Sequence, residues 1–397
     1  MKDEIIVKCI AVVETPLHLF NLMVLLQSRS FVNKWADSSI LVDLVIIQQF
    51  EIDESLNESL SNTGLFNKVI IVKPWYEMSK WRPALATLHR CIFKSGHANA
   101  VRAHLANNID SSDYSLLIAG CASIYAMDIK KAVASDAFTV FYEEGEGSYL
   151  GNFVKSTATY DREILIRSKS RVRKILSSAL YVMDGFNLIF KARQLWLYRP
   201  DLVHEGLYRK NISLCRLELP SGQDRDLITN ALAVGAYNCS NYNKWIFLGN
   251  PDVDLSDSDK NTVRNLILDI ANLIPSPMQV RLHPRSSGNY FFDNDNIEID
   301  NSHELWEVKC LNGSIDGESV LFGFGSTAQI NPSRMFGFEP YLVFLHRLLG
   351  PSIDRDYSEK CYLNTKVKYD NPEKVFCPTS ISELKESISK ICCGNYE

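Results

Sequence analysis

Residues 5–29, IIVKCIAVVETPLHLFNLMVLLQSR, decide the fold class of this chain. The stretch opens with an almost continuous apolar run rich in β-branched residues, which is typical of a strand buried on both faces of a parallel sheet. Thr15 is a candidate N-cap, Pro16 suits the first helical position, and apolar residues then recur at helical spacing. The stretch therefore predicts a strand that leads directly into a helix.

The same alternation of strands and helices continues along the chain. In the first half, strand candidates are SILVDLVII (39–47), NKVIIVK (67–73), YSLLIAG (114–120) and AFTVFYEE (137–144), and helix candidates are 83–95 and 121–134. A second series has strand candidates at 244–251, 278–284, 296–300 and 340–346, a strand, turn and helix at 318–330, and helix candidates at 258–274, 303–311 and 380–393. Such alternation predicts an α/β chain with two Rossmann-like domains facing each other across a cleft.

Length and composition agree with two domains. A chain of 397 residues exceeds what one hydrophobic core usually holds, so we expect an N-terminal domain at 1–235 and a C-terminal domain at 236–397. With 46% apolar and 22% charged residues the chain is of the globular class. The net charge of −5 argues against nucleic acid as a partner.

The sequence predicts a cytoplasmic protein. No stretch reaches the roughly 18 uninterrupted apolar residues of a membrane span, and the first sixteen residues, MKDEIIVKCIAVVETP, lack a signal-peptide pattern. The ten cysteines are scattered without a CxxC pair, which favours reduced, structural thiols.

A pair of like charges stands at one predicted strand end. In FYEEGEGSY (141–149), Glu143 and Glu144 lie between an apolar run and glycines. Ligands of open α/β sheets bind beyond the carboxyl ends of the strands, and a carboxylate raises the proton affinity of its neighbour. We therefore interpret the pair as a candidate for a ligand site at this strand end, with a loop of solvated charge as the alternative.

Further candidates follow the strands of the second half. In RLHPR (281–285), Pro284 biases His283 toward an extended backbone, and the flanking arginines favour an anion nearby, whereas the alternative is an ordinary loop histidine. In LFGFGSTA (321–328), the glycines allow a tight turn, and Ser326 and Thr327 open a helix whose N-terminus attracts phosphate. The alternative there is a glycine turn with an ordinary serine cap.

Glu304 lies between these two motifs. In NSHELWE (301–307), Ser302 is a candidate helix start, which places Glu304 in the first helical turn. A carboxylate at this place can accept both hydroxyls of a ribose. The helix dipole would favour an acidic residue there whatever its role, so the functional interpretation stays open.

The order of these motifs resembles that of the bacterial sialyltransferases of the GT-B architecture, including the lipooligosaccharide and capsular polysialic acid branches. That group is identified by a D/E-D/E-G motif, an HP motif and an SS or ST motif, and here Glu304 lies 21 residues after His283 and 22 before Ser326. ETPLHLFN (14–21) is similar to the first strand-to-helix turn of the group, and FLGNP (247–251) to the start of its second domain. The resemblance covers nearly the whole chain.

The resemblance implies a GT-B fold and an inverting transfer of sialic acid from CMP-sialic acid to a glycan hydroxyl, without metal or other cofactor. It favours Glu143 as the general base, with Glu144 as the alternate, and makes the N-terminal domain the acceptor side. On the donor side, His283 would act on the leaving phosphate, and Glu304 would bind the ribose of CMP. The rest of the implied donor site consists of Gly249, Pro284, Ser326 and Thr327.

Several alternatives stay open. The donor could be another CMP-linked acid sugar such as Kdo, legionaminic or pseudaminic acid, and the chain could instead be a sugar-nucleotide epimerase or a non-catalytic glycan-binding protein. Residues 167–200 mix basic with aromatic and aliphatic residues. This composition suits peripheral contact with the inner face of the cytoplasmic membrane, and equally an interdomain helical segment with a solvated basic edge.

Overall fold

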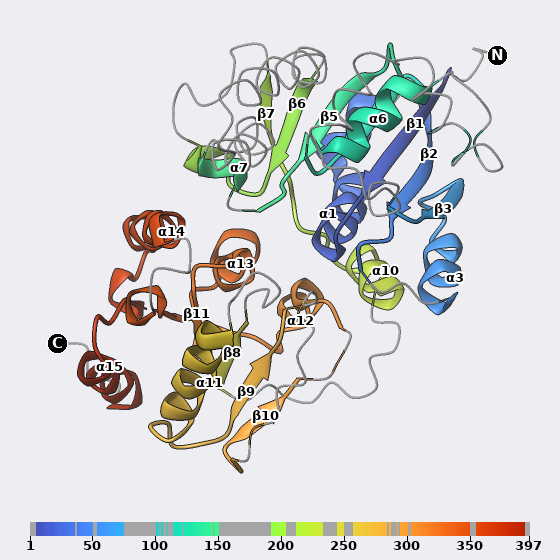
Figure 1. The fold of residues 1–397 in the computed structure, drawn as a ribbon. Coiled ribbons are helices and arrows are strands. Elements are labelled where there is room, and N and C mark those ends of the chain that lie inside the picture. The colour runs from blue at the N-terminus through green and yellow to red at the C-terminus, as the bar shows by residue number, and fades with distance from the viewer. Residues whose placement is uncertain are drawn as a thin grey trace, which may run out of the picture. The chain divides into compact units, whose positions relative to one another are not determined.

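The structure, a computed structural model, divides into two compact units, Met1–Val234 (unit 1) and Gly235–Glu397 (unit 2). Each unit contains one parallel sheet with helices beside it, which confirms the predicted α/β class with two Rossmann-like sheets (Figure 1). The structure describes residues 5–35, 38–50, 54–74, 101, 103, 105, 109, 114–121, 123–145, 147–150, 192–203, 212–232, 244–249, 257–283, 286, 292, 294–300, 302, 304–349 and 355–393.

The sheet of unit 1 is built around β1 (Ile5–Val13). Its strand order is β3-β2-β1-β4-β5-β6-β7. The other strands are β2 (Ser38–Ile47), β3 (Lys68–Val72), β4 (Leu116–Ala119), β5 (Phe138–Tyr142), β6 (Ala192–Leu197) and β7 (Ser213–Arg216). β1 pairs with β2 from Ile5 to Val13 and with β4 from Cys9 to Val12. This central place buries Cys9–Val13 and explains the continuous apolar run.

The first helix of unit 1 begins as the sequence predicts. Pro16 opens α1 (Pro16–Gln27), and Thr15 Oγ1 accepts the backbone N–H of His18 at 3.2 Å. On α6 (Ile124–Val133), the side chains of Ala126 and Ile129 belong to the core of the unit. The structure also describes the helices α2 (Arg29–Val32), η1 (Asn33–Trp35), α3 (Glu54–Asn62), α7 (Gly147–Leu150), η2 (Pro200–Leu202) and α10 (Gln223–Leu232).

Unit 2 has a second parallel sheet, in the order β10-β9-β8-β11-β12-β13. Its strands are β8 (Trp245–Leu248), β9 (Met278–Arg281), β10 (Ile297–Ile299), β11 (Val320–Gly323), β12 (Tyr341–Phe344) and β13 (Val375–Phe376). β8 and β11 are buried along their whole length. The sheet order again reverses beside the first strand of the unit, which is the arrangement of doubly wound folds.

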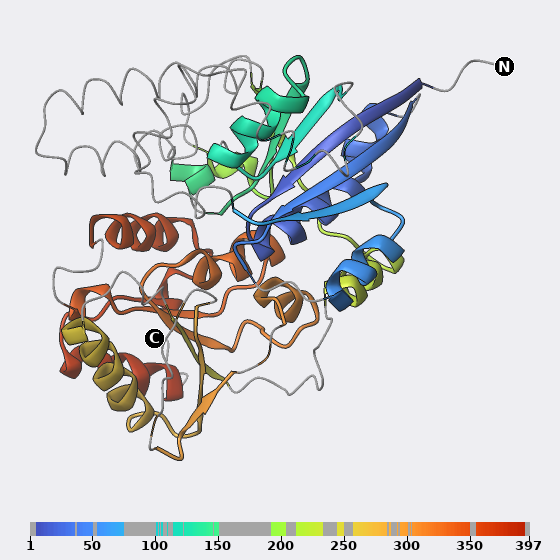
Figure 2. The same ribbon diagram turned by 45° about the vertical axis from the view of Figure 1, so that its right-hand side comes forward.

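The helices of unit 2 cover its sheet. Figure 2 shows α11 (Asp257–Ala271) and α15 (Ile381–Cys393) side by side, and Ile267 of α11 and Ile388 of α15 belong to the same hydrophobic core. The structure also describes α12 (Trp306–Leu311), α13 (Thr327–Phe336), η3 (His346–Leu348), α14 (Arg355–Lys368) and η4 (Pro372–Lys374) in this unit. α12 packs against α13.

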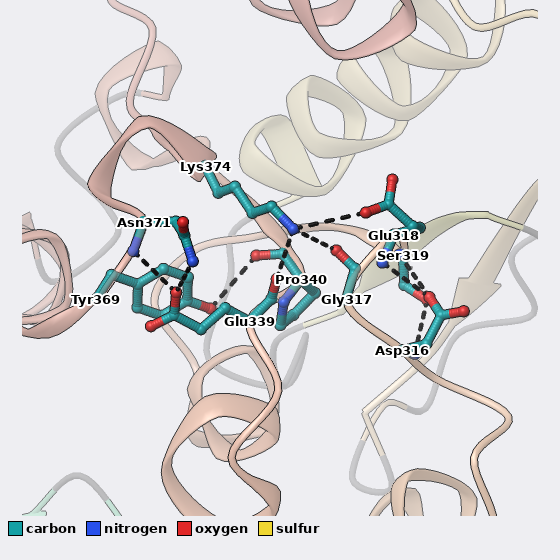
Figure 3. A network of polar contacts seen from close by, with 9 residues as sticks. All are labelled: Asp316, Gly317, Glu318, Ser319, Glu339, Pro340, Tyr369, Asn371 and Lys374. Carbon is teal, nitrogen blue, oxygen red and sulfur yellow. Dashed lines mark hydrogen bonds and ion pairs between the residues drawn. The ribbon is translucent and has the colours of Figure 1, made fainter. Parts of the chain in front are cut away.

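A network of polar contacts joins the residues that precede strands β11, β12 and β13 of unit 2 (Figure 3). The Lys374 ammonium donates to the carbonyl of Gly317 at 2.8 Å and to that of Glu339 at 3.2 Å. The Glu339 carboxylate accepts the N–H groups of Asp370 and Asn371 at 2.8 and 3.0 Å. Because these groups lie at the amino ends of β11, β12 and β13, far from the carboxyl ends that bind ligands, we assign the network a structural role.

Some elements differ from the sequence predictions. Residues 192–197 form strand β6, so the interpretation of 167–200 as a helical segment is wrong for these residues. Polar residues stand at the start of this short strand, where Arg193 is exposed. The strand also follows a basic segment, so its pattern of apolar residues was not recognised as that of a strand. The sequence did not single out α10 or α14, while the helix candidate 83–95 lies outside the described residues.

Two further findings concern membranes and thiols. Among the described residues, no helix combines the length and the apolar character that a membrane span requires. Every described cysteine is a free thiol, and this group comprises Cys9, Cys121, Cys215, Cys310, Cys361, Cys377, Cys392 and Cys393.

Candidate functional site

Each sheet has a point where the strand order reverses. In unit 1 it lies between β1 and β4, which are followed by Glu14 and Gly120, and in unit 2 between β8 and β11, which are followed by Gly249 and Phe324. Ligands of open parallel sheets bind beyond the carboxyl ends of the strands at such a point. The residues that follow these strands therefore form the candidate site of each unit.

Glu143 follows β5, and its side chain is held in the interior of unit 1. Glu143 is 1% exposed, and its Oε2 accepts hydrogen bonds from the Tyr149 hydroxyl at 2.5 Å and from the Tyr198 N–H at 3.0 Å. Its backbone carbonyl accepts Asn21 Nδ2 at 2.9 Å, and the Tyr198 hydroxyl donates to Asn21 Oδ1 at 2.8 Å. Glu143 thus ties the ends of β5 and β6 to α1.

Glu144 has a different environment. Its carboxylate lies with His18 and Cys121, and its backbone N–H donates to Ser148 Oγ at 3.0 Å. Gly145 follows with φ 135°, a conformation that residues with a Cβ rarely adopt, so the glycine is needed there. Burial raises the pKa of Glu144 to about 7, and burial rather than the neighbouring Glu143 is the cause. The pKa of Glu144 therefore suits proton transfer near neutral pH.

Glu14 is a second carboxyl at this edge, and the sequence motifs did not single it out. It accepts a hydrogen bond from the Ser123 hydroxyl, which in turn accepts the Ala126 N–H at 3.0 Å and caps α6. The pKa of Glu14 is raised to about 7, mainly because the carboxyl is buried. The hydrogen bond from Ser123 lowers this pKa, and the charge of Glu144 raises it. The only sequence signal was its place directly after the central strand.

His18 and Cys121 complete the edge of unit 1. His18 lies in the first turn of α1, is 4% exposed, and meets the Tyr142 ring edge-on at 6.2 Å between ring centroids. A Cβ on Gly120 would lie 2.6 Å from Cδ2 of the His18 ring, so only glycine leaves room for it. A ring nitrogen of His18, Cys121 Sγ and a Glu144 carboxylate oxygen all lie within 4.8 Å of one another.

In unit 2, Gly249 and His283 are brought together. The Gly249 N–H donates to the Arg281 carbonyl at 2.8 Å, and a Cβ on Gly249 would lie 3.4 Å from the His283 backbone nitrogen. The carbonyl of His283 accepts the Ser286 N–H at 2.8 Å. His283 is therefore displayed at the end of β9, beside the end of β8, while Pro284 lies outside the described residues.

Glu304 lies in a cluster of charged groups next to that strand end. Arg281 donates to the Glu304 carbonyl at 2.5 Å and to Asp300 at 2.6 Å, and the Lys309 ammonium lies 3.6 Å from a carboxylate oxygen of each acid. The prediction that Glu304 stands in the first turn of a helix is wrong, because α12 begins at Trp306. The reason is that the Ser302 N–H and hydroxyl both bind Asp300 rather than capping α12.

Ser326 and Thr327 begin α13, as the sequence predicts. Ser326 is the N-cap residue, but its hydroxyl makes no cap hydrogen bond and has no partner within hydrogen-bond distance among the described residues. The Trp306 indole donates to the Ala328 carbonyl at 2.8 Å and so links the Glu304 segment to the start of α13. Arg281 thus links the end of β9 to the Glu304 segment, and Trp306 links that segment to the start of α13.

Gln329 shapes the glycine turn before α13, and sequence reasoning missed it. This fully buried amide accepts the Gly325 N–H at 3.0 Å and donates to the carbonyls of Leu321 and Val343 at 3.0 and 3.2 Å. A Cβ on Gly323 would lie 2.9 Å from Gln329 Oε1, and Gly325 has φ 87°. The two glycines therefore accommodate the Gln329 side chain and the turn it stabilises.

A second cluster lies at the carboxyl ends of β12 and β13. His346 Nε2 lies 2.9 Å from Glu359 Oε2 and 3.9 Å from Cys377 Sγ. Arg347 donates to both oxygens of Glu359, at 3.0 and 2.5 Å, and this hydrogen bonding is the main cause that lowers the pKa of Glu359 to about 2. The Glu359 carboxylate is therefore already neutralised by an arginine.

Comparison with solved structures identifies the fold. The chain is similar to the glycotransferase of kitacinnamycin (11% identity, 98% of this chain and 91% of the other covered, TM-score 0.51) and to MnaA of S. aureus with UDP (9% identity, 97% and 88% covered, TM-score 0.51). The UDP-GlcNAc 2-epimerase of Methanocaldococcus jannaschii in complex with UDP-GlcNAc and UDP also matches (11% identity, 98% and 93% covered, TM-score 0.48).

The likenesses to the first two structures show that the chain has a GT-B-like fold, as the sequence predicts. No protein-family model matches the sequence, and a search of curated proteins gives no match.

Proposed function

We propose that the chain is an inverting glycosyltransferase that moves sialic acid from CMP-sialic acid to a hydroxyl of a glycan of the lipooligosaccharide or capsule type. Unit 2 binds the CMP-sugar donor, and unit 1 binds the glycan acceptor and supplies the base. The order of the acidic, HP and ST motifs supports the CMP-linked donor, and the GT-B-like fold agrees with a nucleotide-sugar substrate.

The observation that carries the proposal is the Ser326 hydroxyl at the start of α13. A serine at the N-cap usually binds the N–H groups of its own helix, but here the hydroxyl makes no such bond. The N-terminal N–H groups and the dipole of α13 favour an anion, and a phosphate placed there would also accept the Ser326 hydroxyl. Thr327 and the imidazole of His283 are the further donors of this proposed phosphate site.

These donors suit the chemistry of the departing group. Cleavage of the bond between the anomeric carbon and the phosphate leaves negative charge on the phosphate, and donors already in place stabilise that charge as it develops. Glu304 is proposed to accept the ribose hydroxyls of CMP, and Gly249 and Pro284 to shape the backbone beside the nucleotide. No step in this scheme assigns a role to a metal ion.

Within the acidic pair, we propose Glu144 as the base and Glu143 as a residue that positions the loop. Oε2 of Glu143 accepts hydrogen bonds from Tyr149 and Tyr198. Glu144 lies with His18 and Cys121, and burial raises its pKa to about 7. The acceptor hydroxyl gives its proton to Glu144 as its oxygen bonds to the anomeric carbon. Attack opposite the leaving phosphate inverts that carbon.

The test is incubation with CMP-Neu5Ac and a panel of galactosides and oligosialic acids, with products read by mass spectrometry. We expect an acceptor heavier by one or more sialic acid residues, with Glu144→Gln losing at least about 100-fold in kcat. Panels of CMP-linked Kdo, legionaminic and pseudaminic acid identify the donor. Release of an altered free sugar without an acceptor would instead identify an epimerase, and ligand binding without turnover would identify a glycan-binding protein.

The phosphate site is tested separately by calorimetry with CMP. Ser326→Ala combined with Thr327→Ala should weaken CMP binding by about tenfold or more, since two hydrogen bonds to a charged group are lost. Ser333→Ala in the same helix is the matched control, because the Ser333 hydroxyl donates to the Ile330 carbonyl and does not belong to the start of α13. Equal CMP affinity of the double variant and the control would refute the site.

Peripheral contact of residues 167–200 with an anionic membrane surface stays a proposal, supported by the basic and aromatic composition of that segment. Of this segment the structure describes only residues 192–200, which contain β6 and the start of η2.

A further inference from the structure

We propose that His18, Cys121 and Glu144 form a binding site for a soft divalent cation such as Zn²⁺ at the carboxyl edge of unit 1. Their candidate ligand atoms all lie within 4.8 Å of one another. The three side chains come from the first turn of α1, the turn after β4 and the loop after β5, so the fold brings them together. Imidazole nitrogen, thiolate sulfur and carboxylate oxygen are the ligands that Zn²⁺ takes in proteins.

The His18 ring gives an independent reason to expect a ligand. The residue is 4% exposed, and its Nδ1 has no hydrogen-bond partner among the described residues. A buried polar atom without a partner is costly, and the proposal takes Nδ1 as the metal-binding nitrogen because a bound ion would supply that partner. A neutral imidazole is the form of histidine that binds metal ions, through the lone pair of a ring nitrogen.

The charges around the cluster also favour a cation. Cys121 and Glu144 lie beside a third acidic group, Glu14, and burial raises the pKa of the Cys121 thiol well above its ordinary value. The charges of Glu144 and Glu14 raise it further. A bound divalent cation would take the place of the thiol proton and of the proton of Glu144, which would pass into solvent.

The cluster of His346, Glu359 and Cys377 provides the comparison within the same chain. It offers the same three ligand types within 4.8 Å. Its carboxylate, however, accepts two hydrogen bonds from the Arg347 guanidinium, which occupies the oxygens and repels a second cation. We therefore place the metal site at the unit 1 cluster and not at this one.

If Glu144 is the base of the proposed transfer, the cation has a consequence that rests on that function. An ion held by the Glu144 oxygens takes the lone pairs that would accept the acceptor's proton. Zn²⁺ would then inhibit the transfer, and a chelator would restore it. The binding itself is tested without any activity measurement.

The test uses Co²⁺ as a spectroscopic probe on the full chain, treated with a chelator and then freed of it. A thiolate bound to Co²⁺ gives a charge-transfer band in the near ultraviolet, which reports ligation by cysteine directly. The exposed neighbours Cys392 and Cys393 are both changed to Ser in every sample, because two exposed thiols could bind the probe. Zn²⁺ is then titrated to displace Co²⁺ and give the Kd.

We expect one Co²⁺ per chain with the band present, its loss in Cys121→Ser, and at least about 100-fold weaker Zn²⁺ binding in that variant. Cys377→Ser is the matched control and should keep both the charge-transfer band and the Zn²⁺ affinity of the parent. Glu144→Gln should weaken Zn²⁺ binding but keep the band, and it covers the case that Cys121→Ser does not fold. Absence of the band, or a band that survives Cys121→Ser and disappears in Cys377→Ser, overturns the proposal.

The two proposals fail in different ways. A cobalt band without any Zn²⁺ inhibition of transfer would retain the metal site and remove Glu144 as the base. Loss of transfer in Glu144→Gln without metal binding by the parent protein would retain the base and remove the metal site.

Discussion

Gln329→Met should destabilise the region around β11 and α13 more than any exposed substitution of the same type. The change keeps an unbranched side chain of similar length but removes all three hydrogen bonds of the amide, at 3.0, 3.0 and 3.2 Å. Each such bond contributes about 1 kcal/mol net, and the buried Gly325 N–H would lose the partner it has in Gln329. We therefore expect a loss of about 3 kcal/mol in the free energy of opening this region.

Hydrogen exchange read by mass spectrometry measures that loss in the full chain. A decrease of about 3 kcal/mol corresponds to amides in peptides from 320–345 exchanging roughly 150-fold faster, since 1.4 kcal/mol is a factor of ten. Gln223→Met is the matched control, because Gln223 is exposed at the start of α10 in unit 1. An increase below about fivefold would refute the idea that the amide holds the glycine turn, as it is under 1 kcal/mol.

Three further predictions concern other parts of the chain. Gly120→Ala should destabilise unit 1 by about 1–3 kcal/mol in urea, because the new Cβ would lie 2.6 Å from the buried His18 ring, and an unchanged midpoint would contradict this. The pKa of Glu14 is raised to about 7 in the folded chain, so its contribution to stability is full below about pH 4.5 and is lost as pH rises through 7. In urea unfolding, the free energy of unfolding of the parent should therefore fall from pH 4 to pH 8 by more than that of Glu14→Gln. Parallel curves of this free energy against pH for the two proteins would rule this out. Lys374→Met should cost unit 2 about 1–3 kcal/mol through its hydrogen bonds to Gly317 and Glu339, with CMP affinity by calorimetry unchanged.

The sheet frameworks could be predicted because their strands are short apolar runs in regular alternation with helices. Cys9–Val13 and Leu321–Phe322 are fully buried, as such runs require. Strand β6 was missed because Arg193 and Gln194 interrupt its apolar pattern and the strand follows a basic segment. Helix α14 was missed for a related reason, since Leu363 and Val367 are exposed and its sequence has no clear apolar face.

The sequence predicted only those parts of the candidate site that form short motifs of neighbouring residues. Glu143 and Glu144 are adjacent in the sequence, but only the packing shows that Tyr149 and Tyr198 occupy one carboxylate while burial raises the pKa of the other. Glu14 is a single acidic residue without a local signal, and its environment depends on Ser123, which is 109 residues away. Long-range partners of this kind have no pattern in one sequence.

The hydrogen bonds around Glu143 also bear on how the chain is synthesised. Asn21 is joined to Glu143 across 122 residues and to Tyr198 across 177 residues. Contacts of such large sequence separation form late, because the loop between them must close first. A nascent chain that has not yet emerged past Tyr198 therefore lacks one of the partners of Glu143, and ribosome-bound intermediates of that length should expose the acidic loop to proteases more than the full chain does.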